Sequence, residues 1–522
     1  MSIYNRLSEE RKKLQAEGEC PLWYTTGGYQ LFKEKYSYPA GTTPKQQYKR
    51  IADTLSVHTE NPHKWKEIFF ELLWKGWLSP STPVLANVGT TRGLPVSCAG
   101  SYIGDSVDAI YSAKREVAAL TKQGFGTASY LGDLRPRGTE ISVGGKASGT
   151  LPILKGFQLD MEYVAQGASR RGSWAGYIPI EHGDFYEVCE DLQHNPDGNN
   201  IGWCISDDFI KRLTEEDEDA LARYKAAMHT KMLTGKGYFF FTDKANAKRP
   251  KWYVDLGLDI KSPQLCAEIM LHSSEEYTYT CVLSSVNLAK YDEWEHTDTI
   301  FNATNFLDCV CQEFLERSKN LPGLEKAWSF TKKSRALGLG VCGFHTALQQ
   351  REIVYGSFEA MMFNSKVFEQ LDSESKRASK YLAKTWGIPK WMEGYEYANT
   401  HRIAIAPTKS TALIMGGISE GINPDTAMVY TQRTAAGEVD RINPELHKLM
   451  QKRGVYSKKT VERIRDNMGS IQNEEWMSDK EKEVFRTAFE IPQKSVVQMA
   501  SARAKYIDQW QSLNLFFVLC VF

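Results

Sequence analysis

Between about residues 100 and 290, short β-rich segments alternate with helical ones, and this order constrains the fold more than any other feature. Residues 94–103 (LPVSCAGSYI) and 237–242 (GYFFFT) have strand-like composition, whereas residues 215–233 (EEDEDALARYKAAMHTKML) have helical composition. Strands that alternate with helices are typical of α/β domains. The sequence therefore predicts an α/β fold.

The regions on either side are predicted to be mostly helical. Apolar residues recur at helical spacing in residues 48–57 and 63–78, within a helical region expected over residues 1–90. A loop rich in Ser, Thr, Pro and Gly follows at 79–100. Residues 300–400 are again mostly helical, and a second α/β portion is expected to begin at residue 401 (HRIAIAPTKST).

The composition is that of an ordinary globular protein. Of 522 residues, 42% are hydrophobic and 25% charged, and 64 basic residues balance 64 acidic ones. Zero net charge argues against a broad surface for nucleic acid or acidic membranes. The N-terminus has no apolar signal-peptide core, and no run approaches the ~18 apolar residues that span a bilayer. We therefore expect a soluble, cytoplasmic protein.

The cysteines show no metal-binding spacing. The chain has 10 cysteines but no C-x-x-C pair, no zinc-type Cys/His array and no H-E-x-x-H, so no metal site is expected. In a reducing compartment most of them are thiols. Cys309 and Cys311 form a C-x-C in an amphipathic helical stretch, which favours burial.

Residues 338–343 (GLGVCG) match the G-x-G-x-x-G pattern of dinucleotide-binding loops. In such loops glycine backbones approach a pyrophosphate at a helix N-terminus, directly after a strand. Here the preceding residues, 329–336 (SFTKKSRA), are polar and basic and lie in a region predicted to be helical. Two explanations stay open: a nicotinamide-dependent dehydrogenase, or close packing of a turn or helix.

Three cysteines lie in segments that could carry chemistry. Gln264, Cys266 and Glu268 alternate along the chain, so an extended segment would place an amide, a thiol and a carboxylate on one side. Cys281 lies in the alternating run YTYTCVLSSVNL, and Cys98 closes the Ser/Thr/Pro-rich loop. A buried structural cysteine in an edge segment is the alternative interpretation of Cys266.

The order of these segments resembles the large catalytic subunit of class I ribonucleotide reductase. The supporting motifs, in chain order, are SPSTPVLANVGT, PVSCAGSYIGDS, QGFGTASYLGDLRPRG, AQGASRRGSWAGYIP, QLCAEI, TCVLSSVNL, RALGLGVCG, IAPTKSTALIMGGISEGINP and YIDQWQSLNLFF. The resemblance implies a ten-stranded α/β barrel with a radical-cysteine finger loop, behind an N-terminal helical region at 1–90. It also makes the glycine pattern a structural segment of the family.

The resemblance assigns the catalytic roles. Cys266 would carry the transient thiyl radical that removes the 3′-hydrogen of the substrate, and Glu268 would take the 3′-hydroxyl proton. Cys98 and Cys281 would supply two electrons and become a disulfide. Gln264 stands where the family usually has Asn; both amides can make the same hydrogen bonds, and the extra methylene moves the group by about one bond length. The implied product is a 2′-deoxyribonucleoside diphosphate.

The resemblance also places two kinds of nucleotide. Substrate would contact Thr82, Ser97, Cys98 and Gly124, and the loop Pro407, Thr408, Lys409, Ser410 and Thr411 would hold its diphosphate before a helix. Ser and Thr also favour helix N-caps, a role compatible with this one. A deoxynucleoside triphosphate or ATP effector would bind at a dimer interface through Asp105, Ser106, Arg135 and Arg170, with Arg171 as the alternative to Arg170.

The implied partners follow from the same resemblance. We expect a homodimer, a small subunit whose metal centre generates the radical, and thioredoxin or glutaredoxin as reductant, with no cofactor bound in this chain. No membrane or nucleic-acid contact is expected. Because the helical region begins almost at once, the family's N-terminal ATP-cone domain is expected to be missing, and with it inhibition by dATP.

The end of the sequence departs from the family. Residues 513–522 (LNLFFVLCVF) form an apolar run, which is either a buried final strand or the sign of an interrupted coding sequence; we favour interruption. The expected organisation is thus an incomplete barrel over 91–517 and a non-family tail over 518–522, which includes Cys520. No Tyr-Tyr pair occurs. We expect a separate polypeptide to complete a split, phage-type enzyme in the host cytoplasm. The alternative is a catalytically dead fragment that still dimerises and binds nucleotides.

Overall fold

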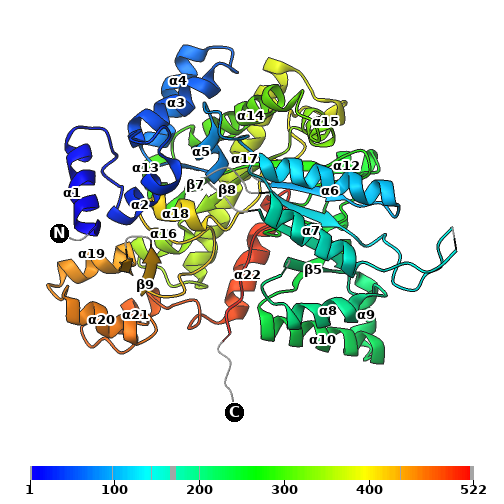
Figure 1. The fold of residues 1–522 in the computed structure, drawn as a ribbon. Coiled ribbons are helices and arrows are strands. Elements are labelled where there is room, and N and C mark those ends of the chain that lie inside the picture. The colour runs from blue at the N-terminus through cyan, green and yellow to red at the C-terminus, as the bar shows by residue number, and fades with distance from the viewer. Residues whose placement is uncertain are drawn as a thin grey trace.

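The computed structural model describes residues 3–96, 98–142, 144–164, 172–198, 200–434 and 437–517. Figure 1 shows a central sheet surrounded by helices, with the N-terminal helices packed near α14, α16 and α18. The α/β fold expected from the sequence is confirmed. Residues 518–522, predicted to be a tail that does not belong to the family, lie outside the described residues.

The N-terminal region is helical, as predicted, apart from one short strand. Its helices are α1 (Ile3–Ala16), α2 (Thr26–Leu31), α3 (Pro44–Ser56), α4 (Pro62–Trp74) and α5 (Thr82–Asn87). Thr43 and Gln46 form a capping box at the start of α3, which satisfies otherwise unpaired N–H groups there. Strand β1 (Leu78–Pro80) joins this region to the sheet, because it pairs antiparallel with β7.

Eight strands form the main sheet, in the order β1-β7-β2-β3-β4-β5-β6, with β8 also paired to β7. They are β1, β2 (Cys98–Tyr102), β3 (Gly126–Tyr130), β4 (Trp174–Pro179), β5 (Asn200–Ile205), β6 (Tyr238–Phe241), β7 (Tyr279–Asn287) and β8 (Leu337–Cys342). Strands β2 to β6 are mutually parallel, and β7 runs antiparallel to β2.

A second parallel series begins at β7. Strand β8 is parallel to β7, Leu339 bridges to Ile403, and Ile405 bridges to Gln511. The described sheet therefore consists of two parallel series that meet antiparallel at β2 and β7. The second series ends in single-residue bridges. Among the described residues the main sheet therefore has eight strands, whereas the family resemblance implied a barrel of ten.

Helices cover the outer face of the first series. They are α6 (Val107–Lys122), α7 (Leu151–Tyr163), α8 (Phe185–His194), α9 (Asp207–Thr214) and α10 (Glu218–Thr234). Alternation along the strands separates two cores: Trp174 and Trp203 pack under these helices, whereas Tyr177 and Cys204 face the other side. The candidate site lies on that inner side.

The remaining helices support the second series and the chain's C-terminal part. They are α11 (Thr242–Ala247), α12 (Lys251–Asp255), α13 (Tyr291–Trp294), α14 (Thr299–Ser318), α15 (Glu325–Ser334), α16 (Phe344–Gln350), α17 (Phe358–Trp386), α18 (Lys409–Ile414), α19 (Pro444–Lys452), α20 (Lys458–Asp466), α21 (Asp479–Val484) and α22 (Gln493–Arg503). A hairpin, β9 (Val429–Thr434) and β10 (Gly437–Ile442), precedes α19. Cys309 and Cys311 are buried in α14, as predicted.

The glycine pattern at 338–343 belongs to a strand, which corrects the expectation of a turn or helix. Gly338 and Gly340 lie inside β8, and Gly343 precedes α16. A Cβ at Gly338 would come within 2.5 Å of Leu283 and 2.9 Å of Cys281 Sγ. At Gly340 it would lie 2.6 Å from the carbonyl oxygen of Ala404. Close packing in the sheet therefore explains these glycines without a dinucleotide.

Candidate active site

Cys98 and Cys281 face each other across the junction of the two parallel series. Cys98 begins β2 and is the register partner of Cys281 in β7. Directly opposed residues of antiparallel strands have Cα atoms about 4.5–5.5 Å apart, a separation that a disulfide can bridge. The register thus brings together two cysteines that are far apart in sequence.

The segment around Cys266 is a tight turn, not the extended segment that the alternation predicted. The N–H of Ala267 donates to the carbonyl oxygen of Gln264 at 3.1 Å, and Ala267 has φ +66°. The side-chain Oε1 of Gln264 also accepts from the N–H of Cys266. Alternation of sides requires extended backbone, so the left-handed residue at 267 removes it. We call residues 264–270 the finger turn.

Glu268 is fully enclosed beside the cysteine pair. Its side chain is 1% exposed, and its Oε2 finds no hydrogen-bond partner among the described residues. Burial raises the pKa of the Glu268 carboxyl to about 8. A buried carboxyl with one unpaired oxygen and a raised pKa is typical of an acid–base group.

Two tyrosines that sequence reasoning missed line the same space. Tyr177, from β4, donates its hydroxyl to the carbonyl oxygen of Gln264 at 3.0 Å. The ring of Tyr279, from β7, lies over Gly100, where a Cβ would come within 1.9 Å of it. Burial raises the pKa of both phenols. In the sequence, each tyrosine occupies an apolar position of a strand. Such a position indicates a core residue and not a functional site.

Gln509 is a third residue that sequence reasoning missed. It lies in the motif YIDQWQS, follows α22, and is buried with 5% of its surface exposed. Its Nε2 donates to Cys281 Sγ at 3.5 Å. Burial raises the pKa of the Cys281 thiol well above its usual value, and the contact with Gln509 acts in the opposite direction.

Two of the residues predicted to contact substrate, Thr82 and Gly124, lie on different connections between elements. Thr82 begins α5 directly after β1 and shares a hydrogen bond of 3.1 Å with the Tyr36 hydroxyl. Gly124, with φ +98°, connects α6 to β3. Ser97 lies outside the described residues, between the loop that follows α5 and Cys98.

The 407–411 loop leads into a short helix. Thr408 occupies the N-cap position of α18 with φ +52°, yet its side chain does not cap the helix. Its hydroxyl accepts from the N–H of Gly421 at 2.8 Å instead, and Thr411 donates to the Thr408 carbonyl oxygen at 3.2 Å. The hydroxyl of Thr408 therefore binds the backbone N–H of Gly421 and does not cap α18, so N-capping does not explain why a threonine stands here.

Three of the predicted effector residues come together at the start of α6. Arg135 Nε and Asp105 Oδ2 form an ion pair of 2.6 Å, and the Arg135 N–H also donates to Asp105. Ser106 caps α6 by accepting from the N–H of Ala109 at 3.1 Å. Arg170 and Arg171 lie outside the described residues.

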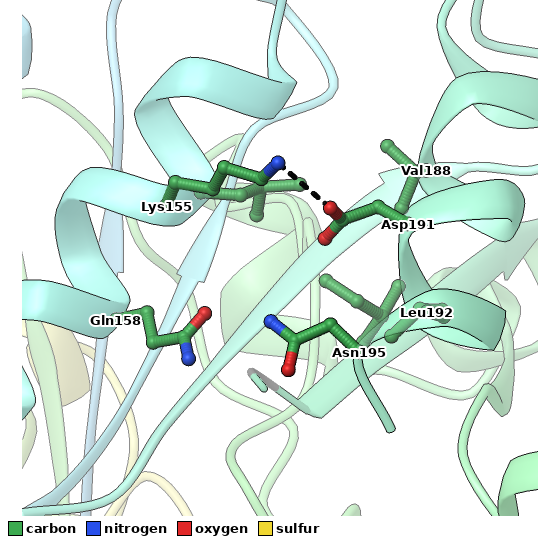
Figure 2. A pocket seen from close by; sticks show the side chains of 8 residues that line it. Lys155, Gln158, Val188, Asp191, Leu192 and Asn195 are labelled. Carbon is green, nitrogen blue, oxygen red and sulfur yellow. Dashed lines mark ion pairs between the residues drawn. The ribbon is translucent and has the colours of Figure 1, made fainter. Parts of the chain in front are cut away.

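A small hollow lies away from this chemistry, between α7 and α8. Figure 2 shows Lys155 and Asp191 facing each other across it, joined by an ion pair of 2.8 Å. It shares no lining residue with the predicted sites. Within the described ranges, no cluster of His, Cys, Asp and Glu is arranged to hold a metal ion. Among the described helices none is both long and apolar enough to cross a bilayer.

Comparison with known proteins gives one consistent result. Residues 22–93 match the family "Ribonucleotide reductase, all-alpha domain", and residues 96–223, 219–399 and 390–519 match "Ribonucleotide reductase, barrel domain". A Frog virus 3 (isolate Goorha) protein that carries the name of a ribonucleoside-diphosphate reductase large subunit is 32% identical over 465 residues, which cover 85% of this chain and 81% of that one.

Two further relatives cover nearly the whole chain. The ribonucleoside-diphosphate reductase large subunit of Invertebrate iridescent virus 3 is 26% identical over 94% of this chain and 88% of its own length. The solved structure of the Actinobacillus ureae class Id ribonucleotide reductase alpha subunit is 38% identical, with a TM-score of 0.87, and the match covers 95% of this chain and 91% of that one.

Proposed function

Since the chain belongs to the ribonucleotide reductase large-subunit family, we propose that it reduces ribonucleoside diphosphates to 2′-deoxyribonucleoside diphosphates through a thiyl radical on Cys266. One observation carries the proposal: the cross-strand pair Cys98–Cys281 shares one core with Ile269 and Met270 of the finger turn, and the buried carboxyl of Glu268 interacts electrostatically with Cys281. A reductase needs these three functions side by side: a radical thiol, an acid–base group and a source of two electrons.

The chemistry balances with these residues alone. The Cys266 radical removes the 3′-hydrogen, and Glu268 accepts the 3′-hydroxyl proton. The 2′-hydroxyl leaves as water, and Cys98 and Cys281 lose two electrons and two protons as they form a disulfide. Cys266 then returns the hydrogen to the 3′-carbon, and Glu268 returns the proton to the 3′-oxygen. The net change is one ribonucleotide and two thiols converted to one deoxyribonucleotide, one disulfide and water.

Cysteine variants test the assignment. In the assembled enzyme, Cys266→Ser should abolish even a single turnover, because the hydroxyl cannot replace the thiol as radical carrier. Cys98→Ser or Cys281→Ser should abolish multiple turnover with dithiol reductants while leaving substrate binding largely intact. Rapid-quench product analysis and equilibrium dialysis measure the two properties. Unchanged multiple turnover in either serine variant of the pair contradicts the disulfide role, and turnover by Cys266→Ser contradicts the radical role.

The nucleotide sites are part of the same proposal. Substrate would bind between Thr82, Ser97, Cys98 and Gly124, with its diphosphate on residues 407–411. Support comes from the packing of α18 against β1, which directly precedes Thr82. An effector triphosphate would bind beside Asp105, Ser106 and Arg135. Their clustering at one end of α6 supports this assignment, since an Arg fork already held by a carboxylate is oriented for phosphate.

Partners complete the proposed enzyme. The radical would come from a metal-containing small subunit, and thioredoxin or glutaredoxin would restore the thiols. A homodimer is supported by the large apolar side chains exposed on α6 and α7.

A further inference from the structure

Gln509 connects the finger turn with the cysteine pair. Its Nε2 donates to Cys281 Sγ at 3.5 Å and to the Leu337 carbonyl oxygen at 2.8 Å, and its Oε1 accepts from the N–H of Met270 at 3.3 Å. We propose that Gln509 is a positioning residue that holds Cys281 in register with the finger turn and favours the reduced form of the Cys98–Cys281 pair. This inference rests on the redox role proposed above for that pair.

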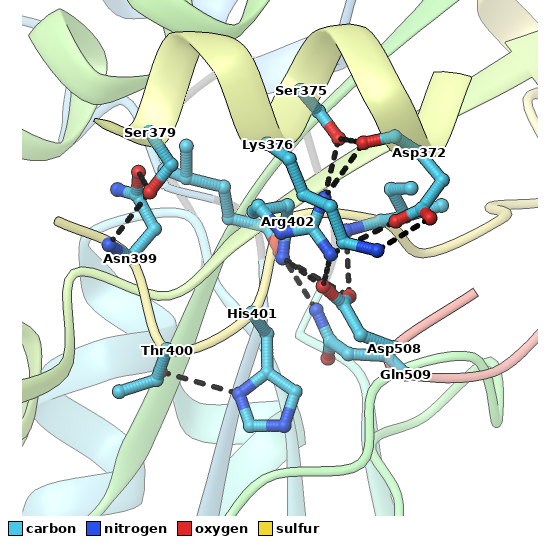
Figure 3. Close-up of polar contacts among 12 residues, drawn as sticks. Asp372, Ser375, Lys376, Ser379, Asn399, Thr400, His401, Arg402, Asp508 and Gln509 are labelled. Carbon is cyan, nitrogen blue, oxygen red and sulfur yellow. Dashed lines mark hydrogen bonds and ion pairs between the residues drawn. The ribbon is translucent and has the colours of Figure 1, made fainter. Parts of the chain in front are cut away.

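The backbone on both sides of Gln509 is fixed. Asp508 accepts from the N–H groups of Arg402 and Ile403 at 3.0 and 2.8 Å and forms an ion pair of 3.0 Å with the Arg402 guanidinium. Figure 3 shows this arrangement, with Gln509 beside the Asp508–Arg402 pair. On the other side, the N–H of Trp510 donates to the Glu268 carbonyl oxygen at 3.0 Å. A residue whose backbone is already fixed has less conformational entropy left to lose when its side chain makes its contacts.

The guanidinium of Arg402 is itself clamped. It donates to the Ser375 hydroxyl at 2.8 Å and to the carbonyl oxygen of Asp372 at 3.1 Å, both on α17. The long helix α17 thereby fixes Arg402, Arg402 fixes Asp508, and Asp508 orients the residue that follows it. Gln509 is therefore placed by the scaffold and not by the cysteine it contacts.

The amide favours one redox state of Cys281 over the other. A thiol or thiolate sulfur accepts a hydrogen bond better than a disulfide sulfur does, so an N–H donor stabilises the reduced pair. Burial opposes ionisation of the Cys281 thiol, and the Gln509 contact offsets part of that effect on its pKa. Loss of the donor should therefore make the disulfide harder to reduce.

A redox titration of the full chain tests this inference without any need for radical chemistry. Wild type, Gln509→Met and the matched control Gln511→Met are equilibrated with mixtures of reduced and oxidised dithiothreitol, quenched in acid and alkylated after denaturation. Mass spectrometry then measures the fraction of Cys98 and Cys281 in the disulfide. For Gln509→Met we expect half-reduction to need about fivefold more reduced dithiothreitol relative to oxidised, a shift typical of one lost hydrogen bond.

Gln511 is a suitable control because it is also buried but contacts other residues. Its Nε2 donates to the Ala500 carbonyl oxygen, and its Oε1 accepts from Arg503. Gln511→Met should titrate like wild type. A wild-type midpoint for Gln509→Met, or an equal shift for Gln511→Met, overturns the role of Gln509. If wild type forms no Cys98–Cys281 disulfide at any ratio, the redox role of the pair fails first, and the inference fails with it.

A second variant covers the case in which Gln509→Met folds poorly by near-ultraviolet circular dichroism. Gln509→Glu keeps the length of the side chain and the acceptor for Met270, and at alkaline pH, where its carboxyl is ionised, it has neither N–H nor O–H to offer to sulfur. Its titration should shift in the same direction. A wild-type midpoint in a folded Gln509→Glu protein contradicts the inference as directly as the first variant would.

Discussion

At the scale of single residues, Glu268 is a carboxyl that the protein encloses almost completely. It lies in the finger turn, and burial keeps its carboxyl neutral in the folded chain below a pH of about 8. As a general base it must be ionised, which sets a requirement on pH. In its proposed role, the burial of Glu268 would therefore make activity depend on pH.

Glu268→Gln should lower turnover by about 10²–10⁴-fold, the usual loss when a general base is removed. In wild type, kcat/KM should rise with pH through an acidic limb near pH 8, since the ionised form is the active one in the free enzyme. Steady-state assays between pH 6 and 9 measure both. A pH-independent kcat/KM over this range would contradict the assignment.

The same substitution should change stability in a pH-dependent way. The pKa of Glu268 is raised in the folded chain, so wild type loses stability as pH rises from about 4.5 to about 8, where the unfolded carboxyl ionises first. Glu268→Gln removes this loss and should melt at a higher temperature than wild type at pH 8.5, with a smaller difference at pH 5.

Glu116→Gln is the matched control. Burial raises the pKa of that carboxyl to about 7, yet it lies on α6, outside the site, so stability should respond to this substitution and turnover should not.

At the residue scale, the local helical pattern correctly predicted the burial of Cys309 and Cys311, whereas the pairing of Cys98 and Cys281 was implied by the family resemblance. The cross-strand register agrees with the pairing expected for Cys98 and Cys281, although their roles stay predictions. The expected extended geometry at 264–268 was wrong, because alternation cannot reveal the left-handed conformation of Ala267. Gln509 could not be assigned a role, since an amide has no reactive signature and its contacts come from segments more than 170 residues away.

At the scale of elements, strand β8 shows how packing can imitate a motif. Its two glycines allow β8 to lie against β7 and the segment around Ala404 without side-chain clashes. The sequence shows the glycines but not their neighbours, so a loop and a close-packed strand look alike. Strand β1 was hidden for a related reason: three residues that include a proline carry no periodicity.

Gly338→Ala should disturb the cysteine pair through this packing. The new methyl group would come within 2.9 Å of Cys281 Sγ, so Cys281 or β8 must move. Overpacking of this kind costs about 1–3 kcal/mol. We expect a lower melting temperature and slower formation of the Cys98–Cys281 disulfide, measured by acid-quenched alkylation.

Gly156→Ala on α7 is the control for this element. There an added methyl group would meet only the flexible terminal amine of Lys114, and Ala favours the helix over Gly by about 1 kcal/mol. This variant should be at least as stable as wild type and should form the disulfide at the wild-type rate. Wild-type behaviour of Gly338→Ala would show that the strand relaxes without transmitting the change to Cys281.

At the scale of the whole molecule, two neighbouring helices present an apolar surface to solvent. Val107 and Tyr111 on α6 are 71% and 67% exposed, and Tyr163 on α7 is 75% exposed. Helices α6 and α7 pack against each other and lie side by side in Figure 1. Large apolar side chains exposed on adjacent helices are typical of protein–protein contacts. Because Asp105 and Ser106 directly precede α6, a dimer formed here would place the proposed effector site at its edge.

Charge on this surface should prevent self-association. The double variant Tyr111→Glu, Tyr163→Glu introduces two carboxylates per copy, and a two-fold contact brings each substitution to the interface twice. We expect sedimentation equilibrium to show a monomer at concentrations where wild type is a dimer, and we expect effector triphosphate to bind more weakly, since the proposed site would lose its second copy. Trp386→Glu, at an exposed apolar residue that ends α17, should leave the dimer intact.

A double variant that still dimerises would move the interface elsewhere, and a monomeric Trp386→Glu protein would place the interface near the end of α17. If the double variant is monomeric but binds effector with wild-type affinity, each copy holds a complete effector site and dimerisation serves another purpose.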